Sequence, residues 1–387
     1  MRDIAILDGA RTPFGRAIKG TLKDTRPDTM ASLVIAEAVR RAGIDPKEVE
    51  DVVLGCAMPE GEQGLNIARV AALGAGLPVE TPAMTINRFC SSGLQSIAIV
   101  GDRIAVGAID VAVAGGVESM SMVPMGGNKP SLNPAMVEQR PEVFTPMGVT
   151  AENLARRYSI DRASQDQFAL RSHQKAVEAI AAGRFKDETL PVEAMVLEGT
   201  SARTVRLERD EMPRGDTTLE KLASLKPAFD PTGTVTPGNS SPLTDGAGAV
   251  VVTTTERAKA LGRKPLGYLR HFAVAGVEPD VMGLGPVPAV RKLLARSGMK
   301  LEQIDLIELN EAFAAQSLAV MRELSLDEAK VNVNGGAIAL GHPLGVSGTR
   351  LTLTILHELR RRGGRYGIVT MCIGGGMGAA AIVEAAR

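Results

Sequence analysis

The sequence predicts a layered α/β fold made of two similar halves, the first of which carries a long insertion. Strand-like segments alternate with segments of helical apolar spacing, and this alternation is typical of α/β layers. The chain also repeats itself: residues 39–55 align without gaps on residues 294–310, and residues 92–117 align at the same offset on residues 347–372. Residues from about 119 to 241 interrupt the repeat, so we expect two α/β units and one inserted segment.

The expected elements of the first half follow one another in a regular order. The opening residues, "MRDIAILDGARTPFG", predict a strand and a turn, and Asp28 is expected to cap a helix that ends near Gly43. The next elements are a buried strand in "VEDVVLGCA", a helix in "GLNIARVAALGAG", a strand in "AMTIN", a helix in "SSGLQSIAIVGDRIAVG" and a strand in "DVAVAGG". Because the repeat has the same order of helix, glycine, acidic turn and strand, we expect matching elements in the second half.

The composition argues against several classes of protein. Lys and Arg number 44 and balance 44 Asp and Glu, so the whole chain has no electrostatic preference for nucleic acid or anionic membranes. The three cysteines lack a CxxC spacing, which argues against a disulfide framework and a zinc site, and we expect no metal. No apolar run has the length of a membrane span, and no signal peptide is evident, so we expect a reducing, cytoplasmic location.

Cys90 lies in "NRFCSSGLQS", where a predicted strand becomes a predicted helix. The backbone N–H groups and the dipole at a helix N-terminus favour a thiolate and lower the pKa of the thiol. Small residues follow Cys90 and leave room for a ligand. The alternative is a buried structural cysteine, which is our interpretation of Cys56 at the end of a hydrophobic strand. For Cys90, its position favours a nucleophile.

A cysteine nucleophile needs a base and donors for an oxyanion, and His342 is the candidate base. It lies in "NVNGGAIALGHPLGVSGTR", at the place that the Cys90 turn occupies in the other copy of the repeat. We therefore expect both turns to face one cleft. His173 and His357 lie in polar helical patterns that predict surface positions, and His271 follows a strand without further signs of chemistry.

Two more segments place polar groups at the ends of predicted strands. Cys372, in "VTMCIGGGMGAA", precedes glycines whose N–H groups can approach a ligand closely, although a tight turn with an incidental cysteine is the alternative. In "ELNEAFAAQ", Asn310 and Glu311 follow a strand on the same side of the expected cleft. Asn310 can hold a catalytic water, and Phe313 is expected on an apolar wall.

These motifs closely resemble those of the thiolases, over essentially the whole chain. The segments "NRFCSSGLQS", "GNSSPLTDGAGA", "NEAFAAQ", "NGGAIALGHPLGVSG" and "CIGGGMG" stand in the family order and at the family spacing. The resemblance implies a thiolase-like, five-layered α/β fold of two βαβαβαββ halves and an inserted loop domain that binds CoA. The halves would be residues 1–119 plus 242–266 and residues 267–387, and the loop domain residues 120–241. A homodimer or a dimer of dimers is also implied.

The resemblance implies a role for each candidate residue. Cys90 would be the acylated nucleophile, His342 the base that takes its proton, and Cys372 the second acid/base. One oxyanion hole would combine His342 with a water on Asn310. The other would combine the main-chain N–H groups of Cys90 and Gly374.

The implied reaction is the CoA-dependent cleavage of a 3-ketoacyl-CoA to acetyl-CoA and a shortened acyl-CoA, as in fatty-acid β-oxidation. An acyl-cysteine intermediate should give ping-pong kinetics. CoA is a co-substrate, and no permanently bound cofactor is expected. The positions that match CoA and substrate contacts of the family are Arg214, Ser241, Phe229, Met147 and Phe313.

Alternatives stay open on substrate and role. Biosynthetic acetoacetyl-CoA thiolases tend to have His-Met-Gly where this chain has Pro146-Met147-Gly148, and "NASG" of many relatives is here "NSSP". Proline cannot donate the hydrogen bond that histidine offers the thioester, which favours a broad-range degradative enzyme over an acetoacetyl-CoA thiolase. A ketoacyl-synthase-type enzyme generally lacks a second cysteine at the Cys372 position. A non-catalytic CoA- or lipid-binding relative is a remote alternative, and a hydratase/dehydrogenase partner subunit remains an open question.

Overall fold

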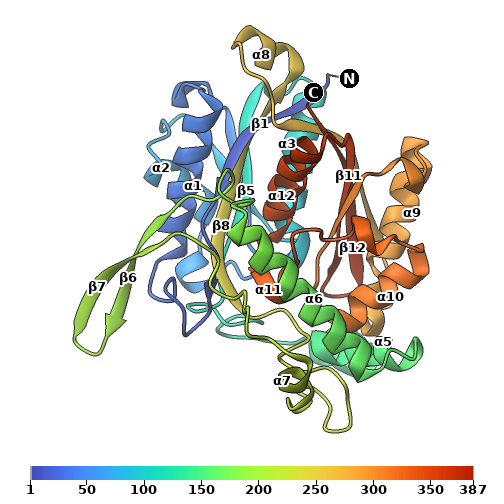
Figure 1. The fold of residues 1–387 in the computed structure, drawn as a ribbon. Helices are drawn as coiled ribbons and strands as arrows, with labels where there is room; N and C mark the ends of the chain where they lie inside the picture. The colour runs from blue at the N-terminus through green and yellow to red at the C-terminus, as the bar shows by residue number, and fades with distance from the viewer. Residues whose placement is uncertain (1, 387) are drawn as a thin grey trace.

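The computed structural model describes residues 2–386 and arranges them in five layers (Figure 1). Two helices cover the first half of the sheet, two helices lie in the centre, and two cover the second half. In this order they are α1 (Pro27–Ala42) and α2 (Ile67–Gly74), α3 (Ser92–Ala105) and α12 (Ser347–Arg362), and α9 (Pro286–Ser297) and α10 (Ala314–Leu324). The five-layered α/β fold predicted from the sequence is confirmed.

Ten strands form one continuous sheet that crosses both halves in the order β10-β11-β12-β9-β1-β8-β5-β3-β4, with β2 paired to β8. The strands of the first half are β1 (Ile4–Arg11), β2 (Gly15–Arg16), β3 (Asp51–Gly55), β4 (Ala83–Ile86), β5 (Val111–Ser119) and β8 (Thr244–Thr254). Those of the second half are β9 (Gly267–Gly276), β10 (Leu306–Leu309), β11 (Tyr366–Ile373) and β12 (Met377–Ala385). The halves join where Ile4–Ile6 of β1 pairs with Gly267–Leu269 of β9.

The elements that the repeat predicted are present in both halves. In the register of the sequence repeat, α3 and β5 correspond to α12 and β11, and β3 corresponds to β10. The match is incomplete at β4, whose place beside β10 is taken by a single bridge between Ile307 and Val331. Sequence spacing therefore predicted the order of elements in the second half but not this shortened strand.

The first helix begins differently from the prediction. Asp28 is not the cap residue: α1 starts at Pro27, Arg26 has the extended cap conformation, and Asp28 lies in the first turn. Proline at the first helical position has the required φ and lacks only an N–H that would have no partner there. The predicted end is confirmed, because Gly43 closes the helix with φ 67°.

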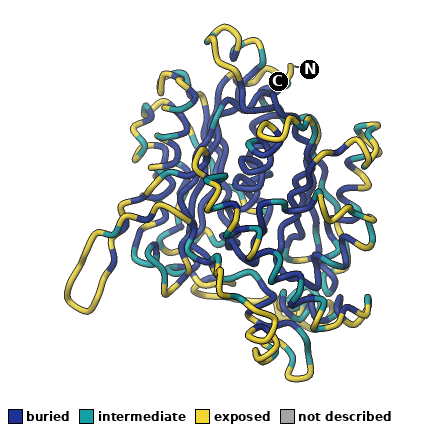
Figure 2. Tube along the Cα trace, in the orientation of Figure 1, coloured by how far each residue is buried: buried dark blue, intermediate teal, exposed yellow. Residues whose placement is uncertain are grey.

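The central helices α3 and α12 are buried, whereas the hairpin of the insertion is exposed (Figure 2). The first turns of α3 and α12 are in contact at two glycines. A Cβ at Gly348 would lie 2.3 Å from the Leu94 nitrogen, and a Cβ at Gly93 would lie 2.6 Å from Thr349 Oγ1. Only glycine permits this approach. The contact brings together the two turns that the sequence predicted to share a cleft.

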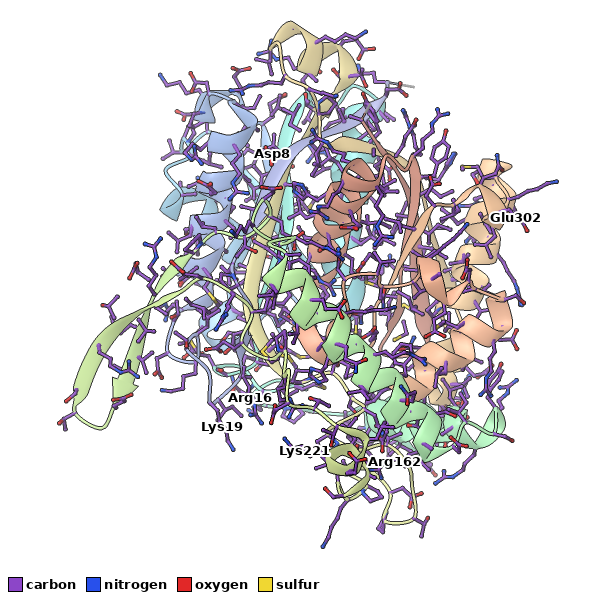
Figure 3. All side chains as sticks on the ribbon, viewed as in Figure 1. Asp8, Arg16, Lys19, Arg162, Lys221 and Glu302 are labelled. Carbon is purple, nitrogen blue, oxygen red and sulfur yellow. The ribbon has the colours of Figure 1, made fainter. Side chains whose placement is uncertain are left out.

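The insertion lies between β5 and β8; its helices pack beneath the second half, and its hairpin lies beside the first half (Figure 1). Its elements are α4 (Pro134–Gln139), α5 (Met147–Arg157), α6 (Arg162–Ala181), the hairpin β6 (Val192–Glu198) and β7 (Ser201–Leu207), and α7 (Leu219–Ala223). Figure 3 shows Arg162 and Lys221 at its lower edge, and Arg162 joins α6 to α7 by donating to the Leu222 carbonyl at 2.6 Å.

Two short helices complete the chain: α8 (Thr255–Ala260) follows β8, and α11 (Ala337–Leu340) precedes α12. Across residues 2–386, every helix is too short or too polar to span a bilayer.

Candidate active site

Cys90 lies in a 3-10 turn, Phe89–Ser91, between β4 and α3. Phe89 has φ 41°, a left-handed conformation that is unfavourable for a bulky residue. Side chains on both flanks hold the turn, since Asn87 Oδ1 accepts a hydrogen bond from the Phe89 N–H at 2.8 Å and the Ser92 hydroxyl donates to the Phe89 carbonyl at 2.7 Å. The strained backbone therefore fixes the direction of the Cys90 side chain.

The Cys90 thiol is 1% exposed, and burial raises its pKa to about 11. The N–H groups of Gly374 and of Cys90 itself point at the sulfur and lower the pKa, while the Glu118 carboxylate raises it. The prediction of a lowered pKa is therefore wrong, because desolvation outweighs the helix N-terminus. The resting group is a neutral thiol.

His342 lies between α11 and α12 and is 5% exposed. Its Nδ1 is 2.6 Å from Ser347 Oγ. The Ser347 hydroxyl donates its own proton to the Pro343 carbonyl at 2.9 Å, so Ser347 Oγ accepts a hydrogen bond from Nδ1–H. The lone pair is then on Nε2, 3.2 Å from the Asn310 amide nitrogen. Burial, with a smaller effect of Arg350, lowers the pKa of His342 to about 3. The imidazole is neutral, and its Nε2 can accept a proton.

Asn310 and Cys372 come from neighbouring parallel strands. Asn310 follows β10 and donates its N–H to the Thr370 carbonyl of β11 at 3.0 Å. Both Asn310 and Cys372 are fully buried. Burial raises the pKa of the Cys372 thiol, and the nearby Cys90 raises it further. The second thiol is thus also neutral at rest.

The structure brings the five predicted catalytic residues to one place, where α3 and α12 begin and β10 and β11 end. The Gly374 N–H points at the Cys90 sulfur, and the Cys372 thiol lies near it. The Asn310 amide contacts His342. Leu344, two residues after His342, packs in the same apolar cluster as Cys90. The predicted roles of these residues remain predictions.

The predicted apolar wall lies beside Cys372. Met147 and Phe313 pack in one cluster with Cys372. The Phe229 ring meets the Phe313 ring edge-on, with centroids 6.0 Å apart and planes at 83°. Gly148 makes room for Phe229, because a Cβ at this position would lie 2.3 Å from the ring. The insertion therefore supplies one side of the wall.

The other two predicted ligand contacts differ in exposure. Ser241 is half-buried, and its N–H donates to the Ala312 carbonyl at 3.0 Å, directly before Phe313. Arg214 is exposed, and its guanidinium forms no ion pair with any residue in 2–386. It is therefore free to meet a phosphate.

Two histidines depart from the predicted surface positions. His173 is buried and its Nδ1 accepts the backbone N–H of Arg214 at 3.2 Å. Burial lowers the pKa of His173, and also that of the half-buried His357, to about 4. Helices α6 and α12 are covered by other elements, and a polar sequence pattern does not reveal such cover. Cys56 is buried, as predicted, whereas His271 lies within β9, paired with Ile382, and not after a strand as expected; its side chain is exposed.

Sequence reasoning missed three residues that hold the site. Ser347 sets the tautomer of His342, and Thr244 Oγ1 accepts the His342 N–H at 3.1 Å. Glu118 is buried at the end of β5. A glutamate at the end of the otherwise apolar "DVAVAGGVES" was the available signal.

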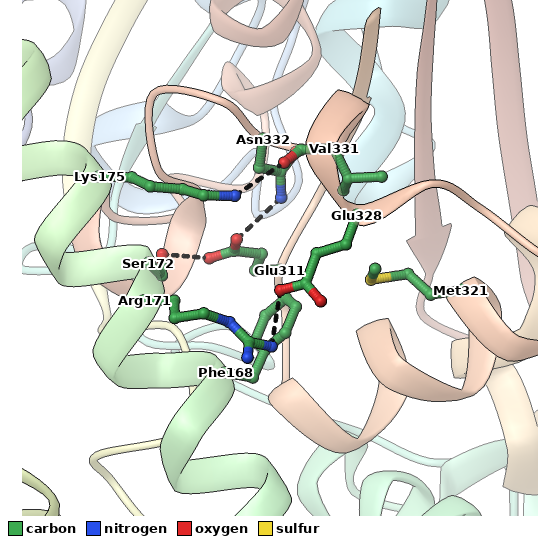
Figure 4. Close-up of a pocket in the computed structure, with 9 residues that line it drawn as sticks. All are labelled: Phe168, Arg171, Ser172, Lys175, Glu311, Met321, Glu328, Val331 and Asn332. Atoms are coloured by element: carbon green, nitrogen blue, oxygen red, sulfur yellow. Dashed lines mark hydrogen bonds and ion pairs between the residues drawn. The ribbon is translucent and has the colours of Figure 1, made fainter.

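A cavity lies between α6 and the second half (Figure 4). Its lining includes Glu311 but not Cys90, His342 or Cys372. Glu311 Oε2 accepts from Ser172 Oγ at 2.6 Å, so it ties the insertion to the strand end that carries Asn310. The full lining is Phe168, Arg171, Ser172, Lys175, Glu311, Met321, Glu328, Val331 and Asn332.

Two models of one protein family together match nearly the whole chain. The family model "Thiolase, N-terminal domain" matches residues 4–256, and "Thiolase, C-terminal domain" matches residues 263–385. The chain belongs to the thiolase family. The resemblance stated from the sequence motifs is thus confirmed.

Individual relatives of this thiolase carry two kinds of name. This chain is 52% identical over 389 residues to the 3-ketoacyl-CoA thiolase of Bacillus subtilis (strain 168), and the alignment covers 99% of this chain and 100% of that one. It is 46% identical to an acetyl-CoA acetyltransferase of Pseudomonas aeruginosa, covering 98% of each chain. The crystal structure of the Bacillus anthracis acetyl-CoA acetyltransferase superposes with a TM-score of 0.90 at 44% identity, covering 100% of this chain and 99% of that one.

Proposed function

We propose that this thiolase cleaves 3-ketoacyl-CoA with CoA, giving acetyl-CoA and a shortened acyl-CoA through an acyl intermediate on Cys90. The observation that carries the proposal is the Cys90 thiol, which receives two N–H groups and has a second thiol, Cys372, beside it. A neutral His342 completes the set, with its lone pair on Nε2, where the Asn310 amide nitrogen lies 3.2 Å away. The similarity to enzymes named 3-ketoacyl-CoA thiolase supports the same activity.

In the first step, Cys90 Sγ attacks the 3-keto carbon, and His342 Nε2 takes the thiol proton. The bond between C2 and C3 then breaks and leaves the acyl group on Cys90. The electron pair of that bond forms the enolate of acetyl-CoA, and Cys372 protonates it at C2. The enolate oxygen would be held by His342 and by a water on Asn310.

In the second step, CoA attacks the acyl group. The Cys372 thiolate takes the proton of the CoA thiol, so that the CoA sulfur attacks the acyl carbonyl. The bond from Cys90 Sγ to carbon breaks, and the protonated His342 returns its proton to the sulfur. The N–H groups of Cys90 and Gly374 would hold the oxyanion of the tetrahedral intermediates.

The pKa values support proton transfer during the attack rather than a stable ion pair. The Cys90 thiol has a pKa of about 11 and His342 a pKa of about 3, so thiol and imidazole both stay neutral in the free enzyme. The charge must therefore develop where the N–H groups can stabilise it, on the oxygen of the substrate.

We propose residues 120–241 as a CoA-binding loop domain between the two parts of the N-terminal half, 1–119 and 242–266, with residues 267–387 as the C-terminal half. Arg214 offers an exposed guanidinium for a phosphate, and Ser241 and Phe229 would line the CoA path. Met147 and Phe313 would form the wall beside the acyl chain.

The second candidate function is that of an acetoacetyl-CoA thiolase, which condenses two acetyl-CoA with the same residues. The relatives named acetyl-CoA acetyltransferase favour it. Pro146, which caps α5 next to Met147, favours the longer substrates, because it lacks the hydrogen bond that histidine would offer the thioester and leaves a more apolar wall for the acyl chain.

The deciding experiment compares CoA-dependent cleavage of acetoacetyl-CoA and of a medium-chain 3-ketoacyl-CoA, with the Cys90→Ala variant as control. Faster cleavage of the longer substrate, lost in the variant, supports the proposal. Cleavage of acetoacetyl-CoA alone supports the second candidate. Absence of cleavage, or equal rates in the variant, contradicts both.

We also propose a homodimer or a dimer of dimers in the cytoplasm. The edge strand β4 has half-buried residues along its whole length, and Leu65 and Val79 nearby in the chain are strongly exposed. Such an edge suits pairing with a second copy. Sedimentation of a fully active monomer would contradict this assembly.

A further inference from the structure

Glu118 is a buried carboxylate that the proposed reaction does not use. It stands near the end of β5, is 1% exposed, and forms no ion pair with any Lys or Arg among residues 2–386. We propose that Glu118 is a positioning residue that fixes the His342 loop against the Cys90 side of the site. This inference rests on the proposed function of Cys90 and His342.

The carboxylate collects donors from both halves of the molecule. Oε2 accepts from the backbone N–H groups of Ala57 and Gly345, both at 2.8 Å. Oε1 accepts from the Met58 N–H at 3.2 Å and from Gln63 Nε2 at 3.0 Å. Ala57, Met58 and Gln63 belong to the first half, and Gly345 belongs to the second. Burial raises the pKa of Glu118, and these four donors lower it. Because N–H donors meet both oxygens, the geometry fits the ionised carboxylate, whose hydrogen bonds are stronger than neutral ones.

The bridge ends close to the imidazole. Gly345 lies three residues after His342 and two before Ser347, which holds Nδ1. The backbones meet here without spare room, since a Cβ at Gly116 would lie 1.9 Å from the Gly345 carbonyl oxygen. A shift of Gly345 must therefore move the segment that carries both His342 and Ser347.

The sequence repeat gives this contact a counterpart in the site. In the repeat register Gly345 corresponds to Cys90, and the end of β5 corresponds to the end of β11. In one half, Gly374 after β11 points its N–H at Cys90. In the other, Glu118 on β5 accepts the N–H of Gly345. Both copies therefore join this strand end to the turn before a central helix, but the strand end donates at Cys90 and accepts at Gly345.

Electrostatics argue for position rather than activation. A negative charge beside Cys90 disfavours its thiolate, so Glu118 works against ionisation of the nucleophile. Glu118 also cannot serve as the base for Cys90 while both of its oxygens are occupied by other donors. Glu118 therefore contributes to catalysis by fixing the position of Gly345.

The test compares the variants Glu118→Gln and Glu118→Asp with the control variant Asp51→Asn. Asp51 is a buried carboxylate at the start of β3; it accepts the Val52 N–H and pairs with Arg103. The glutamine places an NH₂ group against backbone donors, and the aspartate keeps the charge but withdraws it from Gly345. We expect both Glu118 variants to lower kcat by about 10- to 100-fold, with KM for CoA nearly unchanged. Asp51→Asn should lower the melting temperature and leave kcat unchanged.

A second readout does not depend on activity. The sequence holds four histidines, so ¹⁵N spectra of histidine-labelled protein can be assigned with single His variants. The Nδ1 and Nε2 signals of His342 should show the Nδ1–H tautomer in wild type and shift in both Glu118 variants, but not in Asp51→Asn.

Several results would overturn the proposal. These are unchanged kcat in the Glu118 variants, unchanged His342 signals, an equal loss of kcat in Asp51→Asn at equal melting temperature, or failure of both Glu118 variants to fold. If wild type cleaves no 3-ketoacyl-CoA, the proposed function fails instead, and the His342 signals alone decide on Glu118.

Discussion

The turn before α3 and the turn before α12 are corresponding pieces of a repeated structure, and they have opposite uses. The first turn has room for the Cys90 side chain, which is buried. The second has Gly345 at the matching position, where a Cβ would lie 2.5 Å from the Val117 carbonyl oxygen. Duplication supplied the same backbone twice, and local space decides which copy can carry a nucleophile.

The strand ends that meet these turns differ in the same way. At the end of β11, the Cys372 thiol and the Gly374 N–H face Cys90, so the groups that meet Cys90 here are uncharged. Near the end of β5, the Glu118 carboxylate accepts N–H groups and faces Gly345. One strand end is suited to chemistry and the other to holding the loop in place. The following predictions test this division, beginning with the largest effect.

Without Cys90, neither of the two turns carries a nucleophile, so the reaction should stop. Cys90→Ala is expected to reduce thiolysis by at least about 10⁴-fold, because the acyl intermediate cannot form. Steady-state cleavage and the intact mass of substrate-treated enzyme measure this. Cys56→Ala, which removes a buried thiol that contacts Glu118 Oε1 at 3.8 Å rather than Cys90, should still show acylation on Cys90. Acylation of Cys90→Ala would move the nucleophile to another residue.

Removal of the base should leave the nucleophile in place but slow its reaction. His342→Ala is expected to lower kcat by about 10²- to 10⁴-fold, the usual contribution of a general base. The exposed His271 provides the matched control, and His271→Ala should retain wild-type kcat. Equal rates in the two variants would show that His342 takes no proton.

The neutral state of Cys90 predicts slow alkylation. With a pKa of about 11 instead of 9.0, the thiolate fraction at pH 7 is about 100-fold smaller than that of an ordinary cysteine. The rate of Cys90 labelling by iodoacetamide should rise with pH to about 11. A plateau below pH 9 would contradict the desolvated thiol and favour an ion pair with His342.

The same pKa shift makes folding stability depend on pH. The folded pKa of Cys90 lies above the unfolded value of 9.0, so its contribution is complete below pH 9 and is lost as the pH rises towards 11. Urea unfolding between pH 8 and 10.5 should show this loss in wild type and a smaller loss in Cys90→Ala.

A side chain in the second turn should be rejected. Gly345→Ala places a Cβ against two carbonyl oxygens and the Glu118 carboxylate, and we expect it to lower the free energy of unfolding by about 1–3 kcal/mol. Gly298→Ala is the control without steric contact, because open space surrounds that glycine and only its φ of 68° disfavours alanine. Thermal unfolding that is equal for Gly345→Ala and wild type would contradict the steric argument.

The smallest effect is expected at the edge of the site. Phe229→Ala removes the ring contact with Phe313, and aromatic pairs contribute about 0.5–1.5 kcal/mol. KM for CoA or acyl-CoA should rise by up to about tenfold while Cys90 alkylation stays unchanged. A fall in kcat without a change in KM would place Phe229 in the chemistry instead of in binding.

The sequence by itself determined the order of elements, the repeat and the positions of the candidate residues. Apolar period, glycines and strand ends are local properties, so they predicted α3, β5 and the turns at Cys90 and His342. Spacing also implied that the two turns meet, because matching turns of a pseudo-symmetric repeat face each other.

The tertiary structure alone decided the charge states and the supports. The thiol of Cys90 is neutral because surrounding layers exclude water from it, and no local pattern measures that desolvation. Burial of His173 and the bridge from Glu118 to Gly345 likewise join segments far apart in the chain. A sequence encodes its local periods directly, but which groups lose water, and which distant N–H a carboxylate receives, depends on how the layers pack.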